Sequence, residues 1–203
     1  MSEAMRLAAV LLAAGKSERF GRNKLLADFK GRPMISYPLQ AVSAVRAEHM
    51  AVIAGSGRIA ELAYGHGFDV VENCQPELGQ SHSIHLGVRY AMARNADALL
   101  LCVGDQPLLT GESLCRLMAA FAQGGKGMAC LRDGTHAGNP AVFSKAYFPA
   151  LLALNGDRGA KSILRAHEDD LILVCCAGEY ELDDCDTQSA MASLRAAEKK
   201  TNR

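Results

Sequence analysis

The chain has 203 residues, of which 49% are hydrophobic and 22% are charged. This length and composition are typical of a globular protein that buries a substantial core without disulfides or structural metals. Lysine and arginine together number 22, as do aspartate and glutamate, so the net charge of zero provides no general cationic surface for DNA or RNA. We predict a single domain, residues 1–203, that binds no nucleic acid.

The N-terminus and the apolar segments give no sign of export or membrane insertion. Residues 1–6 are mixed in charge, and the apolar run after them ends in glycine, unlike a cleavable signal peptide. No apolar run approaches the roughly 18 residues that a membrane-spanning helix needs. We expect a cytoplasmic protein with no membrane partner and with a polar, disordered tail over residues 198–203.

The seven cysteines are an odd number and form no C-x-x-C pair, so neither a disulfide framework nor a zinc or redox site of that kind is predicted. Four of them lie inside apolar runs and are interpreted as buried core side chains: Cys102, Cys130, Cys175 and Cys176.

Short apolar runs alternate along the chain with segments of helical periodicity. The runs, each interpreted as a buried strand, are Leu7–Ala13, Met50–Ala54, Phe68–Glu72, Ala98–Val103, Met128–Leu131 and Leu171–Cys176. The helical segments are Met34–Val45, Arg58–Tyr64, Ser81–Ala93, Glu112–Phe121, Lys145–Leu154 and Ala160–His167, with another helix beginning near Gln188. The alternation predicts an α/β fold: a three-layer α/β/α sandwich around a mostly parallel, Rossmann-like sheet. Because such sheets bind ligands beyond the carboxyl ends of their strands, the residues after each run are the candidates for chemistry.

The segment LAAGKSERFGRNK, residues 12–24, follows the first run and combines glycines with cationic side chains. Gly15 and Gly21 allow backbone conformations that direct amide N–H groups into a concave site for phosphate oxygens. Arg19 and Lys24 add positive charge. The spacing fits neither a Walker loop nor G-x-G-x-x-G, so these residues alone predict an anion-binding loop, with an ordinary surface turn as the alternative.

The run LLLCV ends in Gly104 and Asp105. A lone carboxylate at the end of a strand, beside a glycine that lets a ligand approach, suits Mg²⁺, which takes one or two protein carboxylates and completes its octahedron with phosphates and water. The alternative is an aspartate that caps a helix or a turn.

The pattern L-A-A-G-x-S-x-R-x-G-x-x-K resembles the signature of nucleotidyltransferases with the MobA-like fold, particularly the molybdenum cofactor cytidylyltransferases. In that family the loop wraps the triphosphate of an incoming nucleotide, and the aspartate of the G-D element binds the metal. The resemblance therefore implies Arg19, Lys24 and Asp105 as catalytic residues. The nucleotide-binding residues that it implies are Leu12, Ala13, Ala14, Gly15, Arg19, Lys24, Ser81, Ser83, Gly104 and Asp105.

The segment ELDDCDTQSA resembles the family's late D-x-D-T element, which supplies a second carboxylate to the metal. Asp186 is the favoured ligand and Asp184 the alternate, with Cys185 in place of the family's usual isoleucine or valine. The residues themselves leave open that Asp186 or Thr187 merely caps the helix beginning near Gln188.

The segment GQSHSIHLGV looks like the family's G-x-S-x-S loop, and Ser81 is also a good candidate for the N-cap of the helix that follows. His82 and His85 lie three apart, but no third ligand of matching spacing is evident for zinc.

The segments GNPAVF and GDRGAKSIL resemble the parts of the family that face the second substrate, which implies roles for Asn139, Asp157 and Arg158. On their own residues the two segments predict a turn and a helix start. Five elements thus occur in the order that the family shows, over nearly the full chain.

The resemblance implies transfer of a nucleoside monophosphate to the terminal phosphate of molybdopterin bearing molybdenum, with Mg²⁺ as cofactor and pyrophosphate as leaving group. Cytidylyltransferases tend to have A-A-G where guanylyltransferases have A-G-G, so Ala14 favours CTP over GTP, through a methyl group that would crowd a purine. The alternatives are a guanylyltransferase of the same family and a non-catalytic chaperone that delivers the cofactor to a molybdenum hydroxylase.

Overall fold

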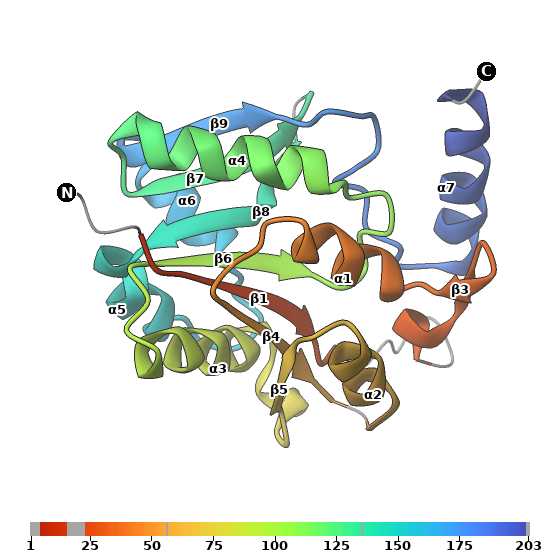
Figure 1. Ribbon diagram of the computed structural model, residues 1–203, viewed down its shortest axis with the longest axis horizontal. Helices are drawn as coiled ribbons and strands as arrows, with labels where there is room; N and C mark the ends of the chain where they lie inside the picture. Colours follow the sequence, from red (N-terminus) through yellow and green to blue (C-terminus); the bar gives the residue numbers. More distant parts are fainter. Residues whose placement is uncertain (1–4, 16–22, 56, 135, 202–203) are drawn as a thin grey trace.

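The computed structural model describes residues 5–15, 23–55, 57–134 and 136–201. Seven strands form one sheet in the order β5-β4-β1-β6-β8-β7-β9 (Figure 1). The strands are β1 (Leu7–Ala13), β4 (His49–Ala54), β5 (Asp69–Glu72), β6 (Ala98–Val103), β7 (Met128–Asp133), β8 (His136–Ser144) and β9 (Leu171–Cys175). Of these, β8 runs antiparallel to both its neighbours, and the other pairings are parallel. The predicted mostly parallel sheet is confirmed. A separate hairpin joins β2 (Asp28–Phe29) to β3 (Arg32–Pro33).

Helices cover both faces of the sheet (Figure 1). One face packs against α1 (Ser36–Ser43), α2 (Gly57–Gly65), α4 (Gly111–Gly124) and part of α7 (Gln188–Thr201). The other face packs against α3 (Gln80–Ala93), α5 (Phe148–Leu152) and α6 (Lys161–Ala166). Short 3₁₀ turns lie at Lys24–Leu26, Pro76–Leu78, Lys145–Tyr147 and Glu168–Asp170. The predicted three-layer sandwich is therefore confirmed, since side chains of one strand enter both cores.

Strand β1 shows why these runs are apolar throughout. Ala9 and Leu11 enter the core on one face, and Ala8 and Val10 enter the core on the other, so all four side chains are fully buried. Leu12 pairs with Val103 of β6, and the N–H of Gly104 donates to the Leu12 carbonyl at 3.0 Å. The first loop and the G-D element consequently leave the sheet side by side.

Strand β8 corrects the interpretation of GNPAVF as a turn. Cys130 pairs with Ala141 and Leu131 with Gly138, so Asn139 and Pro140 fall in a bulge between these two pairs. The bulge admits a proline into an interior strand, because Pro140 has no N–H to donate to a ladder. The same proline is the reason that the sequence does not suggest a strand.

The core prediction for the cysteines is half correct. Cys102 and Cys130 are buried, whereas Cys175 is exposed and Cys176 is only partly buried. Strand β9 is the sheet edge, and Leu173 and Cys175 lie on its less covered side, so an apolar run there does not mean full burial. Helix α7 continues through Thr201, and residues 202–203 lie outside the described part of the chain.

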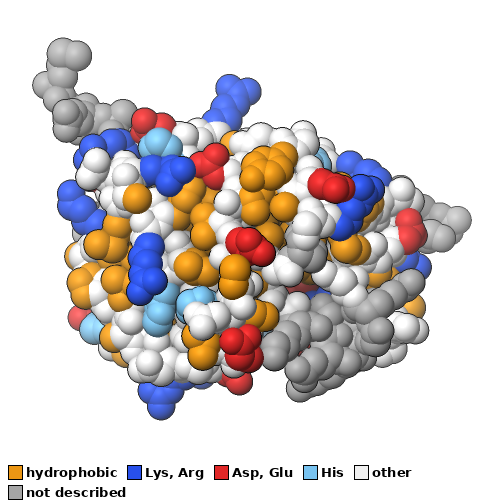
Figure 2. Space-filling view, turned by 90° about the horizontal axis from the view of Figure 1, so that it is seen from below, with side chains coloured by type: hydrophobic (Ala, Val, Ile, Leu, Met, Phe, Trp, Pro, Cys, Tyr) orange, Lys and Arg blue, Asp and Glu red, His pale blue; other side chains and the backbone are white. Residues whose placement is uncertain are grey.

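The surface carries charges of both signs. On the face shown in Figure 2, acidic and basic side chains are interspersed with apolar ones. No helix of the described segments is both long enough and apolar enough to cross a membrane.

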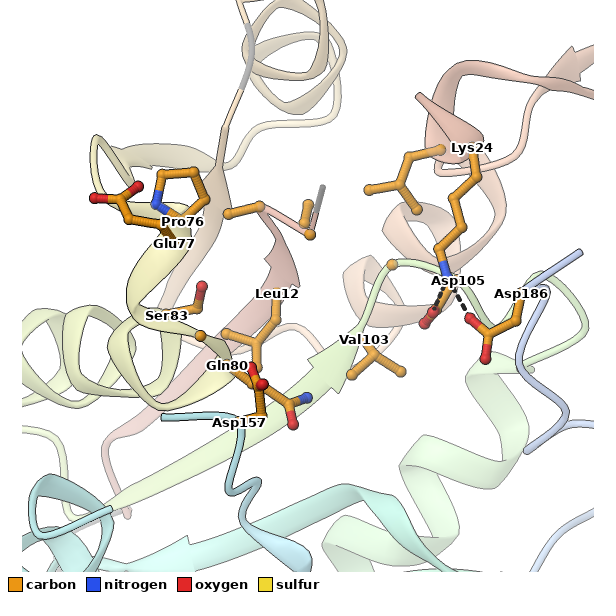
Figure 3. A pocket seen from close by; sticks show the side chains of 16 residues that line it. Leu12, Lys24, Pro76, Glu77, Gln80, Ser83, Val103, Asp105, Asp157 and Asp186 are labelled. Atoms are coloured by element: carbon orange, nitrogen blue, oxygen red, sulfur yellow. Dashed lines mark hydrogen bonds and ion pairs between the residues drawn. The ribbon is translucent and has the colours of Figure 1, made fainter. Parts of the chain in front are cut away.

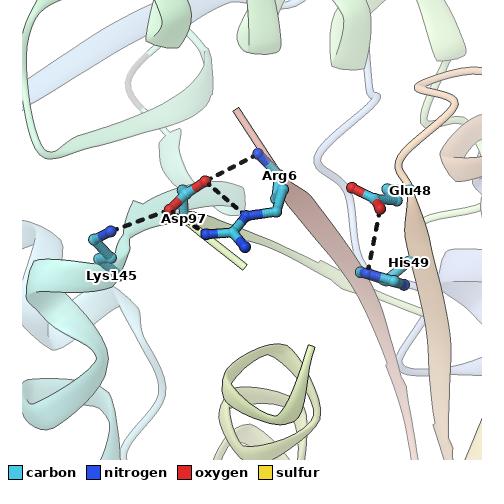
Figure 4. Close-up of polar contacts among 5 residues, drawn as sticks. All are labelled: Arg6, Glu48, His49, Asp97 and Lys145. Atoms are coloured by element: carbon cyan, nitrogen blue, oxygen red, sulfur yellow. Dashed lines mark hydrogen bonds and ion pairs between the residues drawn. The ribbon is translucent and has the colours of Figure 1, made fainter. Parts of the chain in front are cut away.

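Asp97 directly precedes β6, at the end of that strand opposite to Asp105, and its side chain contacts Arg6, just before β1, and Lys145, just after β8 (Figure 4). Its carboxylate accepts hydrogen bonds from the Arg6 backbone N–H at 3.1 Å, from Arg6 Nε at 3.3 Å and from Lys145 Nζ at 3.1 Å. Hydrogen bonds from the Arg6 side chain and backbone, and then from Lys145, hold the pKa of Asp97 well below its usual range.

Because the pKa is lowered on folding, Asp97 stabilises the fold above about pH 4, the ordinary aspartate value, and this contribution is lost as the pH falls further. We expect Asp97→Asn to lower the free energy of unfolding at pH 7, with a difference from wild type that shrinks below about pH 4. Urea titrations from about pH 2.5 to 7 measure this; a difference that stays constant over the range would contradict the assignment.

Candidate active site

A cleft of about 840 Å³ opens beyond the carboxyl ends of β1 and β6 (Figure 3). Its lining comprises Leu12, Ala13, Ala14, Gly15, Lys24, Leu25, Pro76, Glu77, Gly79, Gln80, Ser83, Val103, Gly104, Asp105, Asp157 and Asp186. Most of the predicted nucleotide-binding and metal-binding residues thus meet in one place. Arg19 lies outside the described residues.

Lys24 joins the two carboxylates that the sequence singles out. Its Nζ donates to Asp105 Oδ2 and to Asp186 Oδ1, each at 2.7 Å (Figure 3). The lysine side chain is 13% exposed, against 21% for Asp105 and 56% for Asp186, so the pair with Asp105 is the better shielded from solvent. Burial alone would lower the pKa of Lys24, but the charges and hydrogen bonds of Asp105 and then Asp186 outweigh it, so the pKa is raised. The ammonium is therefore charged at neutral pH.

The segment after β9 is fixed against the G-D element, and this places Asp186. The N–H of Cys185, whose side chain is fully buried, donates to the Asp105 carbonyl at 2.9 Å. Thr187 Oγ1 accepts from the Ala190 N–H at 3.0 Å and so caps α7. Thr187 therefore caps α7, and the Asp186 carboxylate contacts Lys24 instead.

Asp184 has different surroundings. It accepts a hydrogen bond from Gln106 Nε2 at 3.1 Å and borders a second pocket, together with His136 and Leu194. Partial desolvation, and next the charge of Asp105, raise the pKa of Asp184 to about 6. Asp186, and not Asp184, therefore shares the Lys24 ammonium with Asp105.

Gln106 connects three segments behind these carboxylates. The residue is 4% exposed, and besides Asp184 its Nε2 donates to the carbonyls of Asn139 at 3.3 Å and Leu182 at 3.2 Å. Gln106 Oε1 and Asn139 Oδ1 are buried acceptors without a hydrogen-bond donor among the described residues. Neither residue belongs to the lining of the cleft.

The alternative interpretation of Ser81 as an N-cap is wrong. Helix α3 begins at Gln80, and its N-cap is Gly79, with φ 84° and ψ −174°. Ser81 lies inside the first turn, is 3% exposed, and donates its N–H to the Gly156 carbonyl at 3.0 Å. Ser83, two residues further along α3, is among the lining residues, whereas Ser81 is not.

The same contact brings the GDRG segment to the cleft. Asp157 belongs to the lining, while Asn139 and Arg158 do not. A Cβ at Gly79 would lie 2.5 Å from the Gly156 carbonyl carbon and 2.6 Å from Asp157 Oδ1. Glycine is therefore needed at position 79 for two reasons: the positive φ, and the close approach of residues 156–157 to the start of α3.

We expect Gly79→Ala to lower the free energy of unfolding by about 1–3 kcal/mol, because the methyl group is strained at positive φ and displaces residues 156–157. The matched control is Gly65→Ala, at a helical glycine with no neighbour within 4 Å of the added carbon. Urea denaturation of both variants tests this, and equal effects of the two substitutions would contradict it.

Sequence reasoning missed several lining residues, among them Pro76, Glu77 and Gln80. The one available signal was position, since these residues follow the third apolar run at the same edge of the sheet. In the described ranges no three His, Cys, Asp or Glu side chains group as a complete metal site, so a cation here would need ligands from phosphate and water.

Gly15, Lys24, Asp105 and Asp186 lie beyond the carboxyl ends of the strands, which is where α/β proteins with a Rossmann-like sheet bind their ligands. The family model described as the MobA-like NTP transferase domain matches residues 9–171, and the chain belongs to this family of nucleotidyltransferases.

One relative is similar in sequence over nearly its full length, and two solved structures share the fold. The purine catabolism protein PucB of Bacillus subtilis is 32% identical over 201 residues, which cover 94% of this chain and 97% of that protein. A nucleotidyl transferase from Methanothermobacter thermautotrophicus has the same fold, with a TM-score of 0.82, 24% identity, and coverage of 96% of this chain and 98% of the other. Rv0371c from Mycobacterium tuberculosis, solved in complex with manganese, aligns with a TM-score of 0.75 and 24% identity, over 95% of this chain and 100% of the other.

Proposed function

We propose that this protein transfers CMP from CTP to the terminal phosphate of molybdopterin bearing molybdenum, with release of pyrophosphate. The observation that carries the proposal is the convergence of Lys24, Asp105 and Asp186 in a cleft next to the LAAG loop. An acceptor phosphate oxygen attacks the α-phosphorus, the bond to the β-phosphate oxygen breaks, and pyrophosphate leaves. Such a reaction requires positioning and charge neutralisation rather than a covalent enzyme intermediate.

The two carboxylates fit a divalent cation. Their oxygens already share one cationic atom at 2.7 Å each, so they converge on a point that favours positive charge. Asp105 and Asp186 would hold Mg²⁺, and the manganese complex of the related mycobacterial structure supports the use of a divalent metal. Bound there, the ion would neutralise charge on the phosphates.

Each of the other residues has a role toward the substrates. The backbone at Leu12–Gly15 receives the triphosphate, Lys24 and Arg19 supply positive charge to it, and Ser83 and Gly104 border the nucleotide. Lys24 is charged and lies beside the carboxylates, so a small side-chain movement brings its ammonium to the phosphates.

The family resemblance assigns Asn139, Asp157 and Arg158 to the second substrate. Of these, Asp157 borders the nucleotide cleft, with Arg158 next to it in the chain. A molybdenum hydroxylase is the proposed recipient of the product. Ala14 belongs to the cleft lining, in keeping with CTP as the nucleotide, and GTP is the alternative in this family.

Pyrophosphate release tests the proposal. The protein is incubated with Mg²⁺ and each of the four nucleoside triphosphates, with and without molybdenum cofactor. We expect release that requires the cofactor and is fastest with CTP. Fastest release with GTP would indicate the guanylyltransferase. No release with any nucleotide would overturn the proposed enzymatic activity, and the cofactor-delivery chaperone would then be the remaining alternative.

A further inference from the structure

Asn73 is a buried polar residue directly after the edge strand β5, and the proposed mechanism gives it no role. The residue is 3% exposed. Its backbone N–H donates to the Ala54 carbonyl at 2.9 Å, which extends the pairing of β5 with β4 by one residue. The sheet therefore fixes the position of Asn73, and its side-chain amide has two partners whose chemistry determines its orientation.

The first partner identifies the amide oxygen. The Gln75 backbone N–H lies 2.9 Å from Asn73 Oδ1, and a backbone N–H can only donate, so this atom is the acceptor end of the amide. The other end is then the NH₂ group, which can only donate. It lies 3.0 Å from Ser83 Oγ, so the Ser83 oxygen must accept in this contact.

Ser83 is thereby left with its own proton to donate elsewhere. The residue is 7% exposed and lines the cleft. The described part of the chain offers no hydrogen-bond acceptor to this hydroxyl proton. A buried hydroxyl that already accepts from a fixed amide has its proton available to donate to a ligand in the cleft.

The position of Ser83 indicates which part of a nucleotide it meets. Figure 3 shows Ser83, Pro76 and Glu77 on one side of the cleft and Lys24, Asp105 and Asp186 on the other. A triphosphate held at the lysine and the carboxylates leaves the nucleoside on the Ser83 side.

We propose that Asn73 is a positioning residue that sets the Ser83 hydroxyl as a hydrogen-bond donor to an acceptor atom of the bound nucleoside. The proposal rests on nucleotide binding as proposed above. It assigns part of the nucleoside affinity to a residue that does not itself belong to the cleft lining.

Asn73→Asp tests this with almost no change of shape. One oxygen of the introduced carboxylate still accepts from the Gln75 N–H, so the turn is retained, but the other oxygen now accepts where the amide donated. Ser83 then donates to this carboxylate and presents a lone pair to the cleft. Calorimetric titration in the presence of Mg²⁺ is expected to show CTP affinity about tenfold weaker, with the affinity for inorganic triphosphate unchanged.

Further measurements separate positioning from a general effect and locate the acceptor atom. Ser83→Ala should lower the affinity for CTP to a similar degree. Adding Asn73→Asp to Ser83→Ala should lower this affinity no further, because the asparagine acts through the serine. Thermal unfolding of each variant verifies the fold. With 2′,3′-dideoxy-CTP, a retained tenfold difference places the acceptor on the base, and a vanished one places it on a ribose hydroxyl.

The proposal is overturned if Asn73→Asp binds CTP as tightly as wild type does. It is also overturned if the affinities for inorganic triphosphate and for CTP fall by the same factor, as a purely electrostatic effect would require. Wild type that binds inorganic triphosphate but no nucleotide overturns the proposed function as well, so the two failures are distinguishable.

Discussion

Asp105→Asn is expected to lower the rate of nucleotidyl transfer by about 10²–10³-fold, with little change in the free energy of unfolding. Asparagine has the same shape but no negative charge, so a cation at this position loses one of its two carboxylates. The backbone carbonyl of Asp105, which accepts from the Cys185 N–H at 2.9 Å, is untouched, and the segment that carries Asp186 therefore stays in place.

Pyrophosphate release at saturating CTP measures the rate, and urea denaturation measures the stability. The matched control is Asp169→Asn, at an exposed aspartate outside the cleft lining, which should leave turnover unchanged. Turnover of Asp105→Asn within about threefold of wild type would remove Asp105 from the catalytic machinery.

Lys24→Met is expected to have two opposite effects. Turnover falls by about 10²–10³-fold, because the charge on the phosphates is no longer neutralised by the ammonium. Affinity for Mn²⁺ in the absence of nucleotide rises, by about tenfold, because the ammonium occupies the same carboxylate oxygens that a cation would use. Under the proposed function, Lys24 would occupy the metal position until metal and nucleotide bind.

Electron paramagnetic resonance of free Mn²⁺ gives the affinity directly. Lys24→Arg retains the positive charge between the carboxylates and should bind Mn²⁺ no more tightly than wild type. The double variant Lys24→Met with Asp186→Asn should not show the higher Mn²⁺ affinity of Lys24→Met. Unchanged or weaker Mn²⁺ binding by Lys24→Met would contradict competition between the lysine and the metal.

Sequence periodicity predicted the strands and helices that carry the site, because a strand covered on both faces is apolar at every position, as in Leu7–Ala13. It failed at β8, where Pro140 and the bulge beside it suppress the strand signal. It also placed Cys175 in the core, since an apolar run does not reveal which strand lies at the edge of the sheet.

The residues of the candidate site were also predictable only in part. The family motifs implied Lys24, Asp105 and Asp186. Lys24 and Asp105 follow the adjacent strands β1 and β6, whereas Asp186 reaches them through the segment after the edge strand β9, which is hydrogen-bonded to Asp105. The choice between Asp184 and Asp186 depends on tertiary partners that the sequence left open, Gln106 for Asp184 and Lys24 for Asp186. Asn73 and Glu77 belong to no motif, and Gln80 is an unspecified position of the G-x-S-x-S loop. These residues reach the site because β5 lies in the same parallel part of the sheet as β1.

The most direct test of the account follows the α-phosphate of the nucleotide. CTP labelled with ³²P at the α-phosphate is incubated with the protein, Mg²⁺ and molybdenum cofactor, and the cofactor is then separated and counted. Label that moves to the cofactor in wild type, and fails to do so in Asp105→Asn, is the predicted result. Label that remains in CTP or CMP, with unlabelled cofactor bound to the protein, would contradict nucleotidyl transfer to this acceptor.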